Sequence, residues 1–226
     1  MLAGRSGELD QSLALSQEAY TLFEAIGDVR GMCVAASNMG VVLLCQGASE
    51  SAATWLQQSL DSALALDLPM QQAAALVNLG AALLQQGQVD DAQALLTRAL
   101  AIRDPLEYVD GCVNLAYLAL ASVRAGHHQQ ADQLSAQALL ALEEQQQSGV
   151  EHPQQVVFAR AQILHALGRE AEAQAMLQQA HQCLQRMVAA LPTPQEQQHY
   201  LSAFRFNQQL LLALHQGLWP DPPQLM

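Results

Sequence analysis

The side chains with the greatest potential for catalysis or metal binding are seven histidines and four cysteines among 226 residues. His127 and His128 stand together in a predicted turn, where a metal ion would need two further donors. Only Asp132 is near them in the sequence, since Glu143 and Glu144 follow several helical turns later. We therefore interpret the histidine pair as part of a solvated turn, and we predict no metal site.

The other reactive side chains lack the spacing that catalysis requires. Four histidines fall on predicted helices at no common interval, as expected at the edge of a core: His165, His181, His199 and His215. Cys45 and His165 could form a dyad, but they belong to different predicted hairpins. The chain contains no GxxxxGK[ST], GxGxxG, GxSxG or HExxH motif. We predict a protein that is not an enzyme, with neither catalytic residues nor a cofactor.

The cysteines stand singly in predicted helices, without a CxxC pair: Cys33, Cys45, Cys112 and Cys183. We interpret them as reduced thiols in a helical core, which is typical of a cytoplasmic protein. The first five residues lack the basic and then apolar pattern of a secretory signal. No stretch approaches the roughly 18 uninterrupted apolar residues of a membrane-spanning helix. We therefore expect a cytoplasmic location without a membrane partner.

Composition favours helices and excludes some partners. Apolar residues make up 51% of the chain but aromatic residues only 4%, and there are thirty-three glutamines. Alanine, leucine and glutamine are good helix formers, whereas a β-sandwich needs more β-branched and aromatic residues. The formal charge of −12, with arginine as the only strongly basic residue, disfavours binding to nucleic acid or an anionic membrane. The predicted class is an all-α protein.

A repeat of about forty residues organises the chain. Five glycines lie 40, 40, 39 and 42 residues apart: Gly7, Gly47, Gly87, Gly126 and Gly168. A small residue follows each glycine at offsets five and twelve, which share one face of a helix and permit close helix packing. Each glycine is expected to end a helix in the left-handed conformation. The repeat therefore predicts helical hairpins that bury their apolar stripes by stacking on one another.

The predicted elements are ten helices without a long linker. Their approximate ranges are 8–26, 29–46, 49–66, 69–86, 89–102, 105–125, 128–146, 152–167, 170–190 and 194–216. Residues 1–190 would form an α-solenoid of about four and a half hairpins, 191–218 a C-terminal capping helix and 219–226 a tail. Because residues 1–6 leave no room for a helix before Gly7, we expect an incomplete first hairpin. The chain would then be a fragment of a longer repeat protein, or a homodimer that covers the open face of helix 8–26.

The repeat motif resembles the tetratricopeptide repeat (TPR) family. Residues 78–92, NLGAALLQQGQVDDA, contain the family's LG…G…A core, and residues 27–47 repeat it. The next copies depart from Asn-Leu-Gly, with Tyr-Leu-Ala at 117–119 and Ala-Arg-Ala at 159–161. A repeat of forty residues is typical of the C-terminal TPR region of large bacterial signalling and regulatory ATPases. Residues 152–216 resemble the closing segment of that region. The resemblance implies a right-handed α-solenoid that binds other proteins.

In such solenoids the first helix of each hairpin lines the concave side. Counting back from the turn glycines, and adding two asparagines, we expect these partner-binding residues: Val34, Ser37, Asn38, Val41, Ala74, Val77, Asn78, Ala81, Leu84, Gln85, Val113, Leu120, Arg124, Phe158 and Gln162. The set is mostly apolar and lacks the Lys/Asn/Arg clamp that holds a peptide carboxylate in some family members. Asn38 and Asn78 occupy the same repeat position, where their amides bond either to a ligand's backbone or within their own hairpin.

We expect a non-enzymatic protein–protein interaction module, the sensor or scaffold repeat region of a larger bacterial regulatory or defence protein. Its partner would be a peptide, a helix or another domain of the same polypeptide, held in an apolar groove. One alternative is the ligand-sensing TPR domain of a transcriptional regulator, in which Gln155, Phe158 and Gln162 would suit a sugar. A free-standing adaptor or scaffold is the other alternative.

Overall fold

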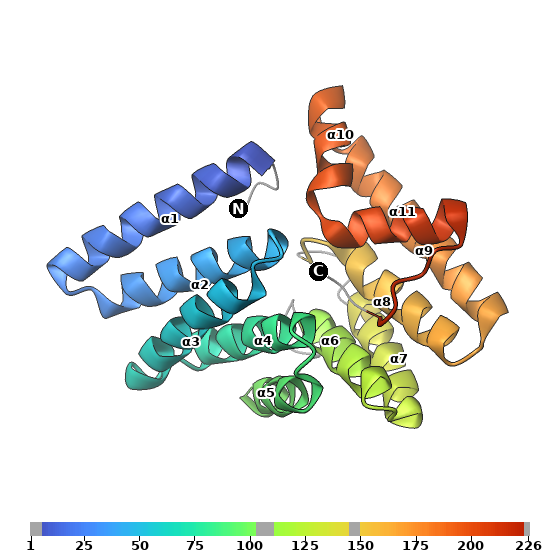
Figure 1. Cartoon of the computed structure of the whole chain (residues 1–226), viewed down its shortest axis with the longest axis horizontal. Helices are drawn as coiled ribbons and strands as arrows, with labels where there is room; N and C mark the ends of the chain where they lie inside the picture. The colour runs from blue at the N-terminus through green and yellow to red at the C-terminus, as the bar shows by residue number, and fades with distance from the viewer. Residues whose placement is uncertain (1–5, 103–110, 145–149, 224–226) are drawn as a thin grey trace. The chain divides into compact units, whose positions relative to one another are not determined.

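A computed structural model describes residues 6–102, 111–144 and 150–223 (Figure 1). These residues form eleven α-helices and no strand: α1 (Ser6–Ile26), α2 (Val29–Cys45), α3 (Ser49–Ala65), α4 (Pro69–Gln85), α5 (Val89–Ile102), α6 (Gly111–Arg124), α7 (His128–Glu144), α8 (Pro153–Ala166), α9 (Glu170–Ala189), α10 (Pro194–Ala203) and α11 (Arg205–Gln216). The helix bounds agree with the predicted ranges to within a few residues, except near the C-terminus. The predicted start of helix 105–125 and the predicted end of helix 128–146 lie outside the described residues.

The helices pair into four hairpins, α2 with α3, α4 with α5, α6 with α7, and α8 with α9. A glycine with φ between 74° and 79° joins the two helices of each hairpin: Gly47, Gly87, Gly126 and Gly168. A residue without Cβ adopts this left-handed conformation at little cost, which explains why the repeat places glycine there. The predicted hairpin turns are confirmed.

Gly7, in contrast, does not end a helix, because it is the second residue of α1. The turn after α1 is made by Gly27, with φ 72°. Forty residues further on, Asp67 makes the turn between α3 and α4 with φ 48°. Aspartate is one of the few other residues found in this conformation. A second class of turns, which joins one hairpin to the next, therefore keeps the same period without always requiring glycine.

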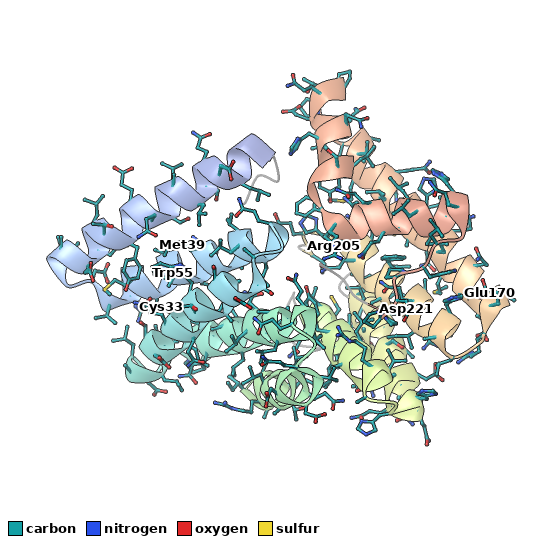
Figure 2. All side chains as sticks on the ribbon, viewed as in Figure 1. Cys33, Met39, Trp55, Glu170, Arg205 and Asp221 are labelled. Atoms are coloured by element: carbon teal, nitrogen blue, oxygen red, sulfur yellow. The ribbon has the colours of Figure 1, made fainter. Side chains whose placement is uncertain are left out.

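By its contacts the chain divides into two compact units, residues up to Arg103 and Asp104–Leu225. In the first unit α1 packs on α2, α3 packs on α4, and the first helices α2 and α4 contact each other. Tyr20 and Met39 are buried in one cluster, with Trp55 partly buried against it. Figure 2 labels Met39 and Trp55. The rings of Tyr20 and Trp55 meet edge to face, with their centroids 5.3 Å apart. This cluster is the aromatic part of an otherwise aliphatic core.

The two helices of a hairpin approach closely where the first helix carries glycine. A Cβ atom added to Gly40 would lie 2.4 Å from Cγ of Leu56, and one on Gly80 would lie 2.8 Å from Cγ of Leu96. Both leucines are fully buried. The small residues at offsets five and twelve on the second helices are at most 1% exposed: Ala52, Ser59, Ala92, Ala99, Ala131, Ala138, Ala173 and Ala180. They serve the close helix packing that their spacing predicts.

The second unit ends in two helices where the sequence predicted one, because the backbone at Phe204 is extended (φ −100°, ψ 123°). Phe204 and Phe206 are both buried, and both rings lie against His152, with centroid distances of 4.5 and 5.5 Å. In a continuous helix residues two positions apart point about 200° apart, so both rings could not reach the same neighbour. The extended residue therefore turns both aromatic rings toward the start of α8.

Helix α8 is enclosed along its length, because every residue from Pro153 to Leu164 is buried. It packs against α6, α7, α9 and α11. Two of its buried polar side chains have partners on these helices: Arg160 Nη1 lies 2.5 Å from Asp132 Oδ1, and Gln155 donates to the hydroxyl of Tyr117 at 3.2 Å. Hydrogen bonds thus compensate for removing these groups from water.

Candidate functional site

The predicted partner-binding residues fall into three groups by exposure. Val34, Asn38 and Ala74 are exposed. Seven are half-buried: Ser37, Val41, Val77, Asn78, Gln85, Val113 and Arg124. The remaining five are buried: Ala81, Leu84, Leu120, Phe158 and Gln162. Only the first two groups are accessible to a partner.

The five buried residues cannot contact a partner, so their predicted role in binding is wrong. Phe158 is 0% and Gln162 is 1% exposed, because α8 packs against α6, α7, α9 and α11. The tail adds to this cover, since the ring of Trp219 stacks on His165 with a centroid distance of 4.4 Å. Leu84 occupies a position that is buried in α2 as well, where Leu44 is its equivalent. In these two hairpins that position belongs to the core, as do Ala81 and Leu120 in theirs.

Seven of the accessible residues gather on two helices that contact each other, α2 and α4. We call them the α2–α4 face: Val34, Ser37, Asn38, Val41, Ala74, Val77 and Asn78. On each helix their spacing of three or four residues places them on one side. Arg30 is the only charged residue of α2, and α4 has none. A partner at this face would therefore be recognised by apolar contact and amide hydrogen bonds rather than by charge.

Asn38 and Asn78 supply the amides of this face. They lie forty residues apart at equivalent positions, and neither side chain forms a hydrogen bond to any residue that the structure describes. Each amide therefore has a donor and an acceptor available to a ligand. Of the two roles predicted for these asparagines, bonding within the hairpin is not observed in the described part of the chain.

Glutamines near the face have a different role, because they hold α4 to its neighbours. Gln85 donates to the carbonyl of Leu44 in α2 at 3.4 Å. Gln72 and Gln86 donate to carbonyls at the two ends of α3, Ala63 at 3.1 Å and Ser49 at 2.9 Å. Gln85, although predicted to contact a partner, thus belongs to the structure that supports the face.

The other predicted contacts, Val113 and Arg124, lie on α6 in the second unit and are half-buried. Burial lowers the pKa of Arg124 from its ordinary value, although a guanidinium stays charged at neutral pH. Between these two residues, all side chains of α6 from Asn114 to Val123 are buried. They therefore add little accessible surface to a binding site.

The histidines form contacts that their sequence positions did not predict. His165 pairs with Glu170, Nδ1 to Oε2 at 2.7 Å, and the rings of His181 and His215 meet edge to face. His127 and His128 are exposed. In the ranges that the structure describes, no three His, Cys, Asp or Glu side chains are grouped to hold a metal ion. None of the helices described is long and apolar enough to span a membrane.

Sequence reasoning missed His152, which stands just before α8. Its Nδ1 lies 2.9 Å from the hydroxyl of Tyr200, and Gln154 donates to the same hydroxyl at 3.0 Å. The signal that could have revealed this cluster is the run of aromatic residues at positions 200, 204 and 206 in a chain otherwise poor in them. The cluster attaches the C-terminal helices to the last hairpin.

Comparisons with known proteins agree with this architecture. Residues 75–107 and residues 154–179 each match a model of the tetratricopeptide repeat. The TPR-like repeats of a protein named as a kinesin light chain of Podosopora anserina have a similar structure, in a Q17M variant (TM-score 0.59, 19% identity, 81% of this chain and 90% of that one). A second structure of those repeats is also similar (TM-score 0.57, 19% identity, 80% and 89%). No curated protein sequence matches. The fold is therefore all-α and TPR-like, as predicted.

Proposed function

We propose that this protein is a non-enzymatic interaction module that binds a protein partner through the α2–α4 face. TPR-like repeats generally mediate protein–protein interaction, and two segments of this chain match that repeat. The observation that carries the proposal is an accessible, uncharged face on which valines flank two asparagines with available amides. The partner is a peptide segment or a helix with an apolar side.

The energetics of such binding follow from the residues of the face. Burial of each valine contributes about 1.5 kcal/mol, and each amide hydrogen bond contributes about 1 kcal/mol net. Because α2 and α4 carry only one charge between them, the affinity should change little with salt. Weak dependence on ionic strength is therefore a signature of this site.

The proposal is tested by capture of partners from the source cell with wild-type protein and two double variants. Val34→Glu with Val77→Glu places charges in the apolar part, and Asn38→Ala with Asn78→Ala removes the amides. We expect the first to abolish binding and the second to weaken it about thirtyfold, because two amide hydrogen bonds of about 1 kcal/mol each are lost. Leu84 is left unchanged because it is buried, and its replacement would test folding instead.

The matched control is Leu140→Glu, which changes an exposed leucine (52%) of α7 outside the face. It should retain the partner, and all variants should keep the helical circular dichroism of the wild type. If the two double variants bind the captured partner as the wild type does, the α2–α4 face is not the site. A strong loss of binding between 0.1 and 0.5 M salt would also contradict an uncharged interface.

The proposal extends to a role as the sensor or scaffold repeat region of a larger bacterial regulatory or defence protein. The forty-residue repeat length and the resemblance of residues 152–216 support it. The cysteines form no disulfide with one another, which supports a reducing compartment such as the cytoplasm. The sugar-binding alternative has lost support, because Gln155, Phe158 and Gln162 are buried. A free-standing adaptor remains the second candidate, and the size of the native polypeptide in source-cell extracts separates the two.

A further inference from the structure

The residues that follow α11 return to the last hairpin. Helix α11 ends at Gln216, and Gly217 with φ 67° begins a segment without helix, residues 217–223, which we call the return segment. In Figure 1 this segment, in dark red, runs from the end of α11 back to α8. There the ring of Trp219 stacks on the ring of His165, with a centroid distance of 4.4 Å and an interplanar angle of 10°. The indole thus lies with its flat face on an imidazole, in the way a ring-shaped ligand occupies a site.

The imidazole of His165 is positioned by the last hairpin itself. Its Nδ1 lies 2.7 Å from Oε2 of Glu170, and Gln174 donates to the other oxygen of that carboxylate at 2.9 Å. The bonds from Gln174 and His165 hold the pKa of Glu170 below its ordinary value, so the carboxylate stays charged. A carboxylate only accepts, so Nδ1 of His165 is the donor. None of these bonds involves Trp219, and the imidazole face is therefore oriented independently of the ring that covers it.

The return segment, in contrast, has few attachments besides this stack. The backbone amides of Gly217 and Leu218 donate to the last turns of α11 and only cap that helix. From Trp219 to Pro223, no residue forms a hydrogen bond or an ion pair with a residue that the structure describes. Three of these five residues are prolines, which have no backbone N–H to donate. An aromatic pair shifts an equilibrium by roughly two- to tenfold beyond its buried area, so the attachment is readily reversed.

We propose that the His165 ring is a binding site for a tryptophan side chain, and that Trp219 is its reversible occupant within the chain. A tryptophan on a segment of another protein presents the same flat ring and competes for the same imidazole face. Because Trp219 is tethered, its effective concentration at the site is in roughly the millimolar range, so the return segment acts as a latch that an incoming tryptophan must displace. This site belongs to the second unit and is a function beyond that of the α2–α4 face.

The test uses a labelled synthetic peptide that copies residues 216–223, with binding to the full chain measured by fluorescence anisotropy. We expect Trp219→Ala, which empties the site, to bind the peptide at least tenfold more tightly than the wild type does. The double variant Trp219→Ala with His165→Ala should lose the peptide, because the imidazole face is gone. A peptide in which alanine replaces the tryptophan should bind neither chain.

A second measurement follows the latch itself. The chain has two tryptophans, so in a Trp55→Phe background the fluorescence reports on Trp219 alone. Adding His165→Ala to that background should raise the quenching of Trp219 by acrylamide, because the ring loses the face that covers it. His165 is 40% exposed at its side chain, so its replacement should leave the helical circular dichroism unchanged.

Two controls isolate the site. In the Trp219→Ala chain, His128→Ala changes an exposed histidine of a turn, and Val34→Glu with Val77→Glu changes the α2–α4 face; both should bind the peptide normally. The proposal is overturned if Trp219→Ala fails to bind the peptide or binds it no better than the wild type does. Peptide binding that survives His165→Ala would overturn it as well, as would unchanged quenching of Trp219 in that variant.

Discussion

The Nδ1 atom of His152 and the hydroxyl of Tyr200 share a hydrogen bond across a distance of 2.9 Å. The amide of Gln154 donates a hydrogen bond to the same hydroxyl. The ring of His152 also lies beside the rings of Phe204 and Phe206. Burial lowers its pKa from 6.5 to about 4. The packing of α10 and α11 against His152 therefore depends on the protonation state of His152.

This relationship predicts that acid weakens the second unit. Between pH 6.5 and 4 the unfolded chain binds a proton at His152 and the folded chain does not, so the free energy of unfolding falls as the pH falls. A shift of this size corresponds to a loss of about 3 kcal/mol once the pH reaches 4. Urea unfolding at pH 7, 5.5 and 4.5 measures it. His152→Phe should flatten the pH dependence, whereas His128→Asn in an exposed turn should leave it unchanged; equal slopes for wild type and His152→Phe would contradict this origin.

The close contact between Gly40 and Leu56 makes Gly40→Ala destabilising, although alanine is the better helix former. The added Cβ would lie 2.4 Å from Cγ of the leucine, and overpacking of this kind costs about 1–3 kcal/mol. The gain in helix propensity is only about 1 kcal/mol, so a net loss of about 1 kcal/mol is expected in urea unfolding. In a Leu56→Ala background the same substitution should instead be neutral or stabilising. A similar loss in both backgrounds would show that the leucine is not the cause.

Asp132 joins the last two hairpins by accepting from two arginines on the same carboxylate oxygen. Arg160 Nη1 lies 2.5 Å and Arg169 Nη1 2.9 Å from Oδ1. Because the side chain of Arg160 is only 11% exposed, Asp132→Ala leaves a nearly buried charge without its carboxylate, and we expect a loss of about 2 kcal/mol in chemical denaturation. Glu172→Ala is the control, since it removes an exposed partner of Arg169 and should change little. Equal effects of the two substitutions would show that burial of Arg160 is not decisive.

Much of the helical architecture could be predicted because its determinants are local. Gly47, Gly87, Gly126 and Gly168 mark four turns, since each turn needs a left-handed residue whatever lies around it. Alanine and glutamine favour helix between those turns independently of tertiary contacts. The two asparagines of the α2–α4 face were likewise identified by their repeat position alone. Gly7 matched the same period without making a turn, which shows that the repeat identifies positions but not conformations.

Exposure depended on elements far apart in the chain, and only the tertiary structure decided it. Val34 and Phe158 were both predicted to lie on the concave side from their distances to the turn glycines of their hairpins. Phe158 is nevertheless fully buried, whereas Val34 is 46% exposed. The difference arises because helices about forty residues away in sequence, with Trp219 of the tail, enclose α8. The break at Phe204 has the same origin, since two rings must reach His152. Local propensity and spacing thus determine the helices and their turns, whereas long-range packing determines which of their faces remain open to a partner.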